Sequence, residues 1–291
     1  PASPAVRCIL RACCCMGPTP PEPLDHMSTA AEILPVQEAF SRQSGAFDAI
    51  DVANPLIGWV RERVRTECLK FVRPGDRLLE LNAGTGIDSV FFAEQGVHVL
   101  ATDQAPGMLA QLCSKQRPGL PLNVKALSFL DLGELKGKQF DHIFSNFGGL
   151  NCTDRLDEVL REARDLLAPG GSMHLVIMPR VCLWELAWSF KGQFSKAFRR
   201  LKRGGTMAHL EGVYFPCHYY DPGAVARMAP DLNVRVVKGL SVFYPPPHMQ
   251  GKAERWPKLT RLAERLENGL CTRWPFNAWG DHYLIILQRS N

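Results

Sequence analysis

The sequence predicts an α/β fold in which helices cover both faces of a seven-stranded, mostly parallel sheet. Three observations predict it. Short apolar runs alternate with helical segments of about ten residues. The runs are apolar on both sides, as strands are when both faces of a sheet are covered. A glycine-containing turn joins the first run to the helix that follows it. The 291 residues, 46% of them apolar, suffice for one such domain with an additional cap.

The strands are predicted from apolar runs that end at turn-forming or acidic residues. They are expected at residues 77–81, 97–102, 124–130, 140–145, 172–178, 232–243 and 283–288. The last strand is expected to pair antiparallel beside the strand at 232–243.

The helices are predicted where apolar residues recur at spacings of three and four. Between the strands they are expected at residues 87–95, 105–115 and 156–168, with Gly96 ending the first and Pro169-Gly170-Gly171 the third. Residues 28–72 are expected to form two further helices that cover the sheet, the second opening at Pro55. Asp221-Pro222 is typical of a helix start. A later amphipathic helix is expected at 257–270, with Leu259, Leu262, Ala263 and Leu266 on one side.

The domain organisation follows from these segments. Residues 1–26 hold Cys13-Cys14-Cys15 and a proline-rich run, and we expect them to be a disordered leader or an extension. Residues 27–291 are expected to form one domain. Within it, helices occupy 27–72, the core of the sheet 73–178, and a helical cap with the final strands 179–291.

Composition excludes several classes of protein. The most apolar region, residues 174–190, is broken by Pro179, Arg180 and Glu185, so no transmembrane segment is expected. None of the ten cysteines forms the C-x-x-C spacing of a zinc site, and we expect no metal. Scattered cysteines in a chain of this size are typical of a reduced, cytoplasmic enzyme.

The charge of the chain is positive but dispersed. A net charge of +5 does not by itself indicate nucleic acid, which is an unlikely partner. The densest basic run is Lys196–Arg203. It is either a solvated helix face or a contact with an acidic substrate or a membrane surface.

A nucleotide-binding constellation stands at the first strand. The run Leu78–Asp88 leads from a strand through Gly84 and Gly86 into a helix start, whose free N–H groups favour anionic or polar ligands. Seventeen residues after Gly86, the second strand ends in Asp103, where a carboxylate can accept hydrogen bonds from ribose hydroxyls. Ser89 stands at the third small-residue position of the dinucleotide fingerprint, which disfavours NAD without excluding it.

Five motifs in order resemble class I methyltransferases that use S-adenosylmethionine (SAM), of the type that acts on small molecules. They span residues 77–178. The motifs are Glu80–Gly86, Ala101–Asp103 with Pro106–Leu109, Phe129–Asp131, Phe140–Ser145 and Leu166–Gly171. Asn82 stands where that family usually has glycine. Because asparagine tolerates left-handed backbone well, we interpret this as a subfamily variant.

The resemblance implies that residues 73–178 bind SAM as the cofactor. It assigns Glu80 to the turn near the methionine amino end, Asp103 to the ribose, Met108 and Asp131 to the adenine, and Asn146 to the methionine moiety. Met108 as plain core and Asp131 as a helix cap remain alternatives. The expected cofactor-binding residues are Glu80, Asn82, Ala83, Gly84, Gly86, Asp103, Gln104, Met108, Asp131 and Asn146.

The acceptor is expected to be a small molecule, methylated on oxygen or nitrogen. The loop at 145–151 lacks the D/N-P-P-Y/F motif that amino-methylating DNA enzymes use on a flipped base. Aromatic and basic residues after Pro179 suggest a large, partly anionic acceptor. His218, before Tyr219-Tyr220, is the candidate catalytic base, ahead of His248 and His282, although a lone histidine is more often structural. An NAD-dependent oxidoreductase and a non-catalytic binding module remain alternatives. The sequence does not indicate the oligomeric state.

Overall fold

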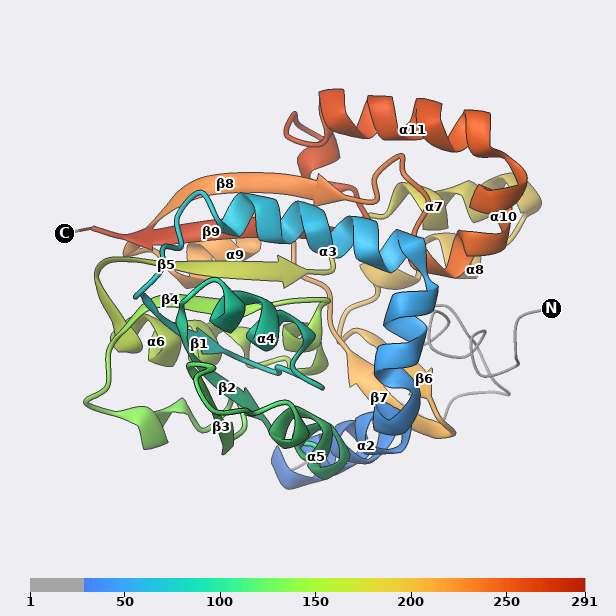
Figure 1. Ribbon diagram of the computed structural model, residues 1–291. Helices are drawn as coiled ribbons and strands as arrows, with labels where there is room; N and C mark the ends of the chain where they lie inside the picture. Colours follow the sequence, from blue (N-terminus) through green and yellow to red (C-terminus); the bar gives the residue numbers. More distant parts are fainter. Residues whose placement is uncertain (1–28, 291) are drawn as a thin grey trace.

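A seven-stranded sheet forms the centre of the computed structural model, which describes residues 29–290 (Figure 1). The order is β3-β2-β1-β4-β5-β9-β8. The first five strands are parallel, and β9 lies antiparallel between β5 and β8. The predicted fold, including the antiparallel last strand, is confirmed. The strands are β1 (Arg77–Glu80), β2 (His98–Asp103), β3 (Leu122–Ala126), β4 (Phe140–Ser145), β5 (Leu167–Ile177), β8 (Leu232–Leu240) and β9 (His282–Arg289).

Helices cover both faces of the sheet. On one face α3, α4 and α5 pack against Leu78, Phe144 and Ile286. On the other, α6, α9 and the short helix η1 pack against Leu79 and Ile285. Because neighbouring strand residues point to opposite faces, the continuous apolar runs supply both cores. These helices are α3 (Pro55–Cys68), α4 (Ile87–Glu94), α5 (Pro106–Ser114), α6 (Leu156–Leu166), α9 (Pro222–Met228) and η1 (Leu132–Leu135).

Three predicted strand boundaries are off by three residues or more. The strand predicted at 232–243 ends at Leu240, because Ser241 lies in left-handed backbone. The third strand ends at Ala126, because the chain turns there and carries Leu127 and Phe129 into the core as loop residues. The fifth strand begins at Leu167 rather than Ser172, since Pro169-Gly170-Gly171 lies within an irregular stretch of β5 that still pairs with β4. Asp221 precedes α9 as predicted, but its carboxylate accepts from the backbone N–H of Arg180 rather than capping the helix.

The cap was expected to be helical, but it also contains strands. It includes a hairpin of β6 (Thr206–Leu210) and β7 (Val213–Cys217). The long first helix, α2 (Thr29–Ala53), packs against both α5 and β7 (Figure 1). Residues 179–291 therefore contribute both strands and helices to the cap. The remaining short helices are α7 (Leu183–Leu186), η3 (Ala187–Lys191), α8 (Phe194–Ala197), η4 (Arg199–Leu201), η2 (Gly149–Cys152), η5 (Pro247–Met249), α10 (Gln250–Arg255) and η6 (Phe276–Ala278).

Helix α11 (Pro257–Leu270) has the predicted bounds, but its apolar side faces outward, unlike that of an ordinary amphipathic surface helix. Leu259, Leu262 and Leu266 are exposed, whereas Glu267 is fully buried. The Glu267 carboxylate accepts hydrogen bonds from the N–H groups of the turn after β8, which explains why the polar side faces inward. Within residues 29–290, no helix combines the length and apolarity that crossing a membrane requires. The expected leader, residues 1–26, lies outside the described residues.

Candidate functional site

The site lies where β1, β2 and β4 end. The turn after β1 has three residues in left-handed backbone, namely Asn82 (φ 47°), Gly84 (φ 57°) and Gly86 (φ 81°). Asn82 therefore tolerates the conformation predicted for it. An added Cβ on Gly86 would lie 2.2 Å from Leu112 of α5, so only glycine fits. At Gly84 an added Cβ would meet no atom within 4 Å, because this glycine faces open space.

Asp103, at the end of β2, is held by backbone N–H groups. One carboxylate oxygen accepts from Gly84 and the other from Ala105, each at 2.8 Å. Burial raises the pKa of Asp103, although these hydrogen bonds oppose the shift. Each carboxylate oxygen has further lone pairs, so the group can still accept hydrogen bonds from a ligand.

A cavity of about 110 Å³ opens beside this turn. Six of the expected cofactor-binding residues line it: Asn82, Gly84, Asp103, Gln104, Met108 and Asn146. The sequence prediction missed the rest of the wall. It consists of side chains of α2, Ala105 and Phe129, and of Phe147, Gly149 and Cys152 after β4.

The other expected cofactor residues do not line this cavity. Asp131 is exposed and stands at the N-cap position of η1, where the alternative prediction placed it. Its side chain makes no capping hydrogen bond. Glu80 is buried behind the turn, where Ser89 donates a hydrogen bond to its carboxyl group. Burial, reinforced by the neighbouring Asp88, raises the pKa of Glu80 to about 8. Ala83 and Gly86 belong to the turn after β1 but do not line the cavity.

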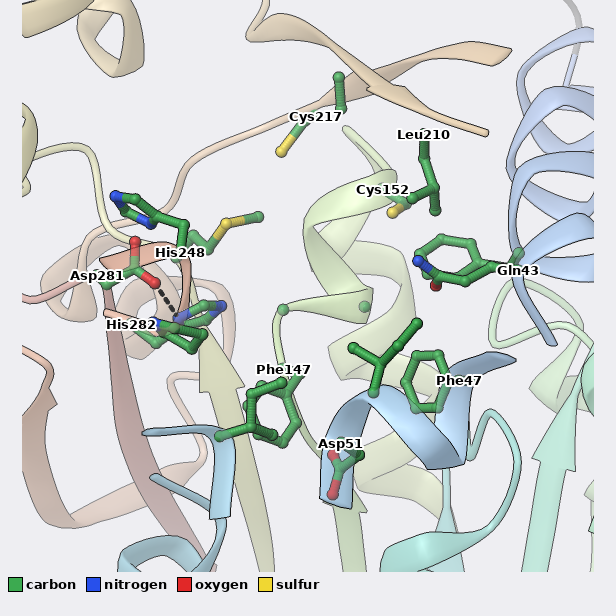
Figure 2. Close-up of a pocket in the computed structure, with 18 of the residues that line it drawn as sticks. Gln43, Phe47, Asp51, Phe147, Cys152, Leu210, Cys217, His248, Asp281 and His282 are labelled. Carbon is green, nitrogen blue, oxygen red and sulfur yellow. Dashed lines mark ion pairs between the residues drawn. The ribbon is translucent and has the colours of Figure 1, made fainter. Parts of the chain in front are cut away.

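A second cavity, of about 210 Å³, adjoins the first (Figure 2). The two share Phe40, Phe47, Phe147, Gly149 and Cys152 in their linings. The larger one is bounded by α2, the β6–β7 hairpin, the loop after β4 and the start of β9. Apolar side chains make up most of its wall.

Helix α2 contributes one side of both cavities. Phe40, Gln43, Phe47 and Ile50 recur at spacings of three and four, which places them on one face of the helix. That periodicity was available in the sequence, but nothing local indicated that the face would cover the carboxyl ends of the strands. Gly107 makes the close approach of α5 to α2 possible, since a Cβ there would lie 2.6 Å from the Ser41 carbonyl oxygen.

The loop after β4 lines both cavities. Phe147 is in left-handed backbone (φ 51°), and the Asn146 side chain accepts a hydrogen bond from its N–H at 2.8 Å. The Asn146 amide also donates to Asp88 at 2.9 Å. The guanidinium of Arg61 lies 4.7 Å from the centre of the Phe147 ring and pairs with Asp88. A buried polar network thus holds a strained turn at the centre of the site.

Asp281 and His282 form a hydrogen-bonded pair at the edge of the larger cavity. His282 Nδ1 lies 3.1 Å from the Asp281 carboxylate, whose other oxygen accepts from Arg200 at 2.8 Å. Burial alone would raise the pKa of Asp281, but His282 and Arg200 hold it well below its ordinary value. His282 Nε2 is buried and has no hydrogen-bond partner among the described residues. Figure 2 shows this nitrogen pointing away from Asp281, toward the middle of the cavity.

The structure does not bring His218 to either cavity. Its backbone N–H donates to Asn151 and its carbonyl accepts from the Asn151 side chain, while burial lowers the pKa of its ring. His248 and His282, which the sequence ranked lower, line the larger cavity instead. Their positions depend on long-range packing of the cap, and no local motif marks them.

Two arginines of the basic run are not available to an acceptor. Arg199 and Arg200 are buried in ion pairs with Glu185, and Arg200 also pairs with Asp281. Cys182, Glu185 and Asp281 bring possible metal-ligand atoms within 4.8 Å of one another. Because Arg199 and Arg200 already pair with both carboxylates, these groups belong to the ion-pair network.

Residues 79–173 match the family model described as a methyltransferase domain. This segment resembles a methyltransferase domain. The match covers the turn after β1, Asp103 and the loop after β4, which are the parts that form the smaller cavity. The predicted resemblance to class I SAM-dependent methyltransferases is thereby confirmed.

Two curated methyltransferases are similar to part of this chain. A demethylmenaquinone methyltransferase of Streptomyces avermitilis is 36% identical over 124 residues, which is 42% of this chain and 52% of that protein. A malonyl-[acyl-carrier protein] O-methyltransferase of Serratia marcescens is 31% identical over 160 residues, 53% of this chain and 57% of that protein. The chain thus spans little more than half the length of either.

Solved structures share the fold over most of the chain. The 1,6-didemethyltoxoflavin-N1-methyltransferase of Burkholderia thailandensis, solved with S-adenosylhomocysteine (SAH), has a TM-score of 0.56 at 16% identity. The match covers 93% of this chain and 94% of that one. A DhpI–SAH complex has a TM-score of 0.53 at 15% identity, covering 91% and 99%. At such identities the likeness establishes the architecture alone.

Proposed function

We propose that the protein transfers a methyl group from SAM to a small-molecule acceptor held in the larger cavity. The observation that carries the proposal is the pair of adjoining cavities at the carboxyl ends of the strands. The smaller cavity is built from the turn after β1 and Asp103, and it shares Phe147 and Gly149 with the larger one. Two ligands bound there would meet at the loop after β4.

The residues present fit SAM in the smaller cavity. Gly84 faces open space beside Asp103, so a ligand can approach the backbone closely. Asp103 would hold the ribose hydroxyls, Met108 would contact the adenine, and Asn82 and Asn146 would lie at the methionine end. When bound, SAM supplies a methyl group on a positively charged sulfonium. The match to a methyltransferase domain favours this cofactor over NAD.

The larger cavity favours an apolar acceptor of one or two rings. An engineered apolar cavity of about 150 Å³ is enough to bind benzene, and this one measures about 210 Å³. Its charged residues are already paired: Arg61 with Asp51, and Asp281 with Arg200. We therefore expect a less anionic acceptor than the one that the basic run Lys196–Arg203 suggested. The relatives named for demethylmenaquinone and for a malonyl carrier support a small organic acceptor.

We propose His282 as the general base, replacing His218. Asp281 would hold the proton on His282 Nδ1 and leave Nε2 to accept the proton of an acceptor hydroxyl. The acceptor oxygen would form its bond to the methyl carbon as the carbon–sulfur bond of SAM breaks and the hydroxyl proton moves to Nε2, so that SAH would be the leaving group. The surrounding cavity would exclude water and fix the acceptor in line.

Two measurements test the proposal. Calorimetry with SAH and with NADH, on the wild type and on Asp103→Asn, should show SAH binding that the substitution weakens. Transfer of label from methyl-labelled SAM should then be followed over a panel of hydroxylated aromatic compounds. His282→Gln should lower kcat by roughly 100-fold or more while SAH binding stays unchanged. Absence of SAH binding would refute the function. SAH binding without transfer to any acceptor would favour the non-catalytic binding module.

A further inference from the structure

The α11 helix exposes leucines where a surface helix normally exposes polar residues. Leu259, Leu262 and Leu266 are 59%, 51% and 42% exposed. Their spacings of three and four place them in one stripe along the helix. Trp256, just before the helix, is 58% exposed and extends the stripe. Among the elements of residues 29–290, Figure 1 shows none over the outer side of α11.

The inward side of α11 is polar and fully used. Besides the buried Glu267, the Glu264 carboxylate accepts a hydrogen bond from the Trp59 indole at 2.8 Å. Asn268 accepts a hydrogen bond from Arg63 of α3. The helix cannot rotate to bury its leucines without breaking these bonds, so the outward stripe is a fixed feature of the fold.

A second exposed apolar segment lies at the same end of the molecule. Phe190 and Phe194 are 93% and 61% exposed, and Phe198 and Leu201 are 45% and 42% exposed. Figure 1 shows α7 and α8 at the same end as α10 and α11. His248, two residues before α10, lines the larger cavity together with Asp281, which pairs with Arg200. We name the eight side chains together the exposed apolar face: Phe190, Phe194, Phe198, Leu201, Trp256, Leu259, Leu262 and Leu266.

Positive charge is concentrated on the same two segments. Residues 185–203 hold six cations and one carboxylate, and residues 250–270 hold five cations and three carboxylates. Together they exceed the +5 net charge of the whole chain, so the remainder is net negative. On α11 the exposed side chains of Lys258, Arg261 and Arg265 lie next to the leucine stripe. On the other segment Lys191, Lys202 and Arg203 are exposed.

Exposed aromatic and leucine side chains bordered by lysine and arginine are typical of helices that lie in a membrane interface. We propose that the exposed apolar face docks on an anionic lipid bilayer, with the leucines and aromatic rings in the headgroup region and the cations on the lipid phosphates. Pro247 and His248 line the larger cavity and lead directly into α10, so docking brings the cavity close to the bilayer.

Vesicle flotation of the full chain tests the docking without any acceptor or methyl transfer. We expect binding to mixed phosphatidylcholine–phosphatidylglycerol vesicles, weak binding to phosphatidylcholine alone, and release by salt. Leu262→Glu with Leu266→Glu should lower the partition coefficient about tenfold or more. Both positions are exposed, so the fold should persist, as circular dichroism would show. Val234→Glu is the control. Val234 is also an apolar side chain at the surface, 46% exposed, but it lies on β8 and does not belong to the exposed apolar face.

The outcomes separate the possible occupants of the face. Equal flotation of the wild type and the double variant, or no flotation on the anionic vesicles, would overturn the proposal. A dimeric wild type that the double variant converts to a monomer would show instead that a second copy covers the face. Sedimentation velocity at the flotation concentrations provides that measurement.

Discussion

Asn82 and Gly149 form a matched pair at the centre of the site. The Asn82 side chain accepts a hydrogen bond from Ser145 at 2.8 Å and crosses toward the loop after β4. A Cβ on Gly149 would lie 2.2 Å from the Asn82 amide nitrogen. The asparagine that replaces the family's usual glycine is thus accommodated by a glycine on the opposite loop.

This pairing predicts a rescue. Gly149→Ala should lower the melting temperature and weaken SAH binding, because the added methyl group collides with Asn82. Asn82→Gly alone should cost about 1 kcal/mol through the lost hydrogen bond. The double variant should be more stable than Gly149→Ala alone, and thermal melts of all four proteins would measure the coupling. Additive effects would contradict the pairing.

Glu80 predicts a pH dependence of stability. Its ordinary pKa of 4.5 rises to about 8 in the fold, so the folded state binds a proton that the unfolded state has released between these values. The free energy of unfolding should therefore fall as pH rises from about 5 to about 8, by at most about 1.4 kcal/mol per pH unit from this group.

Glu80→Gln cannot titrate and should escape this loss. Relative to the wild type without ligand, its melting temperature should rise progressively from pH 5 to pH 8. The glutamine can still accept the hydrogen bond from Ser89. A difference between the two proteins that stays constant across this range would show that Glu80 is ionised in the fold.

At the scale of elements, α2 completes the site only because α5 lets it approach. Gly107→Ala places a methyl group against the Ser41 backbone, which cannot move without displacing the helix. We expect weaker SAH binding and a lower melting temperature. Gly133→Ala is the matched control, since an added Cβ there meets no atom within 4 Å. Equal SAH affinity in both variants would mean that the position of α2 does not matter for the cofactor site.

At the scale of the whole molecule, a buried ion-pair network joins the cap to the sheet. Glu185 of α7 pairs with Arg199 and Arg200, and Arg200 continues to Asp281 at the start of β9. Removing the Glu185 charge would leave two buried guanidinium groups with one remaining carboxylate between them. The cost of breaking such a network is about 3–5 kcal/mol, a large share of a typical domain's total stability.

Glu185→Gln should therefore lower the midpoint of urea unfolding substantially. The exposed Glu94–Arg117 pair provides the comparison, because both of its side chains are about half in solvent. Glu94→Gln should change the midpoint little. Similar midpoints for the two variants would mean that the cap is held by apolar packing rather than by this network.

The sequence by itself determined the sheet and the cofactor turn. The apolar strands, the helix period and the Glu80–Gly86 turn with Asp103 are local signals, and they fix the order of elements and the polar groups at the strand ends. The left-handed backbone at Asn82 could be expected because asparagine tolerates that conformation and stands at a position where the resembling family usually has glycine.

Only the tertiary structure decided the larger cavity, the histidines that line it and the direction of the α11 leucines. His218 and His282 have equally plain local contexts, and the choice between them depends on which one the cap folds over the sheet. The periodicity of α11 shows that it has an apolar side but not which side the protein buries. Glu264 decides that through a partner 205 residues away along the chain, and Glu267 through one 25 residues away. Such contacts between distant segments are absent from any local pattern.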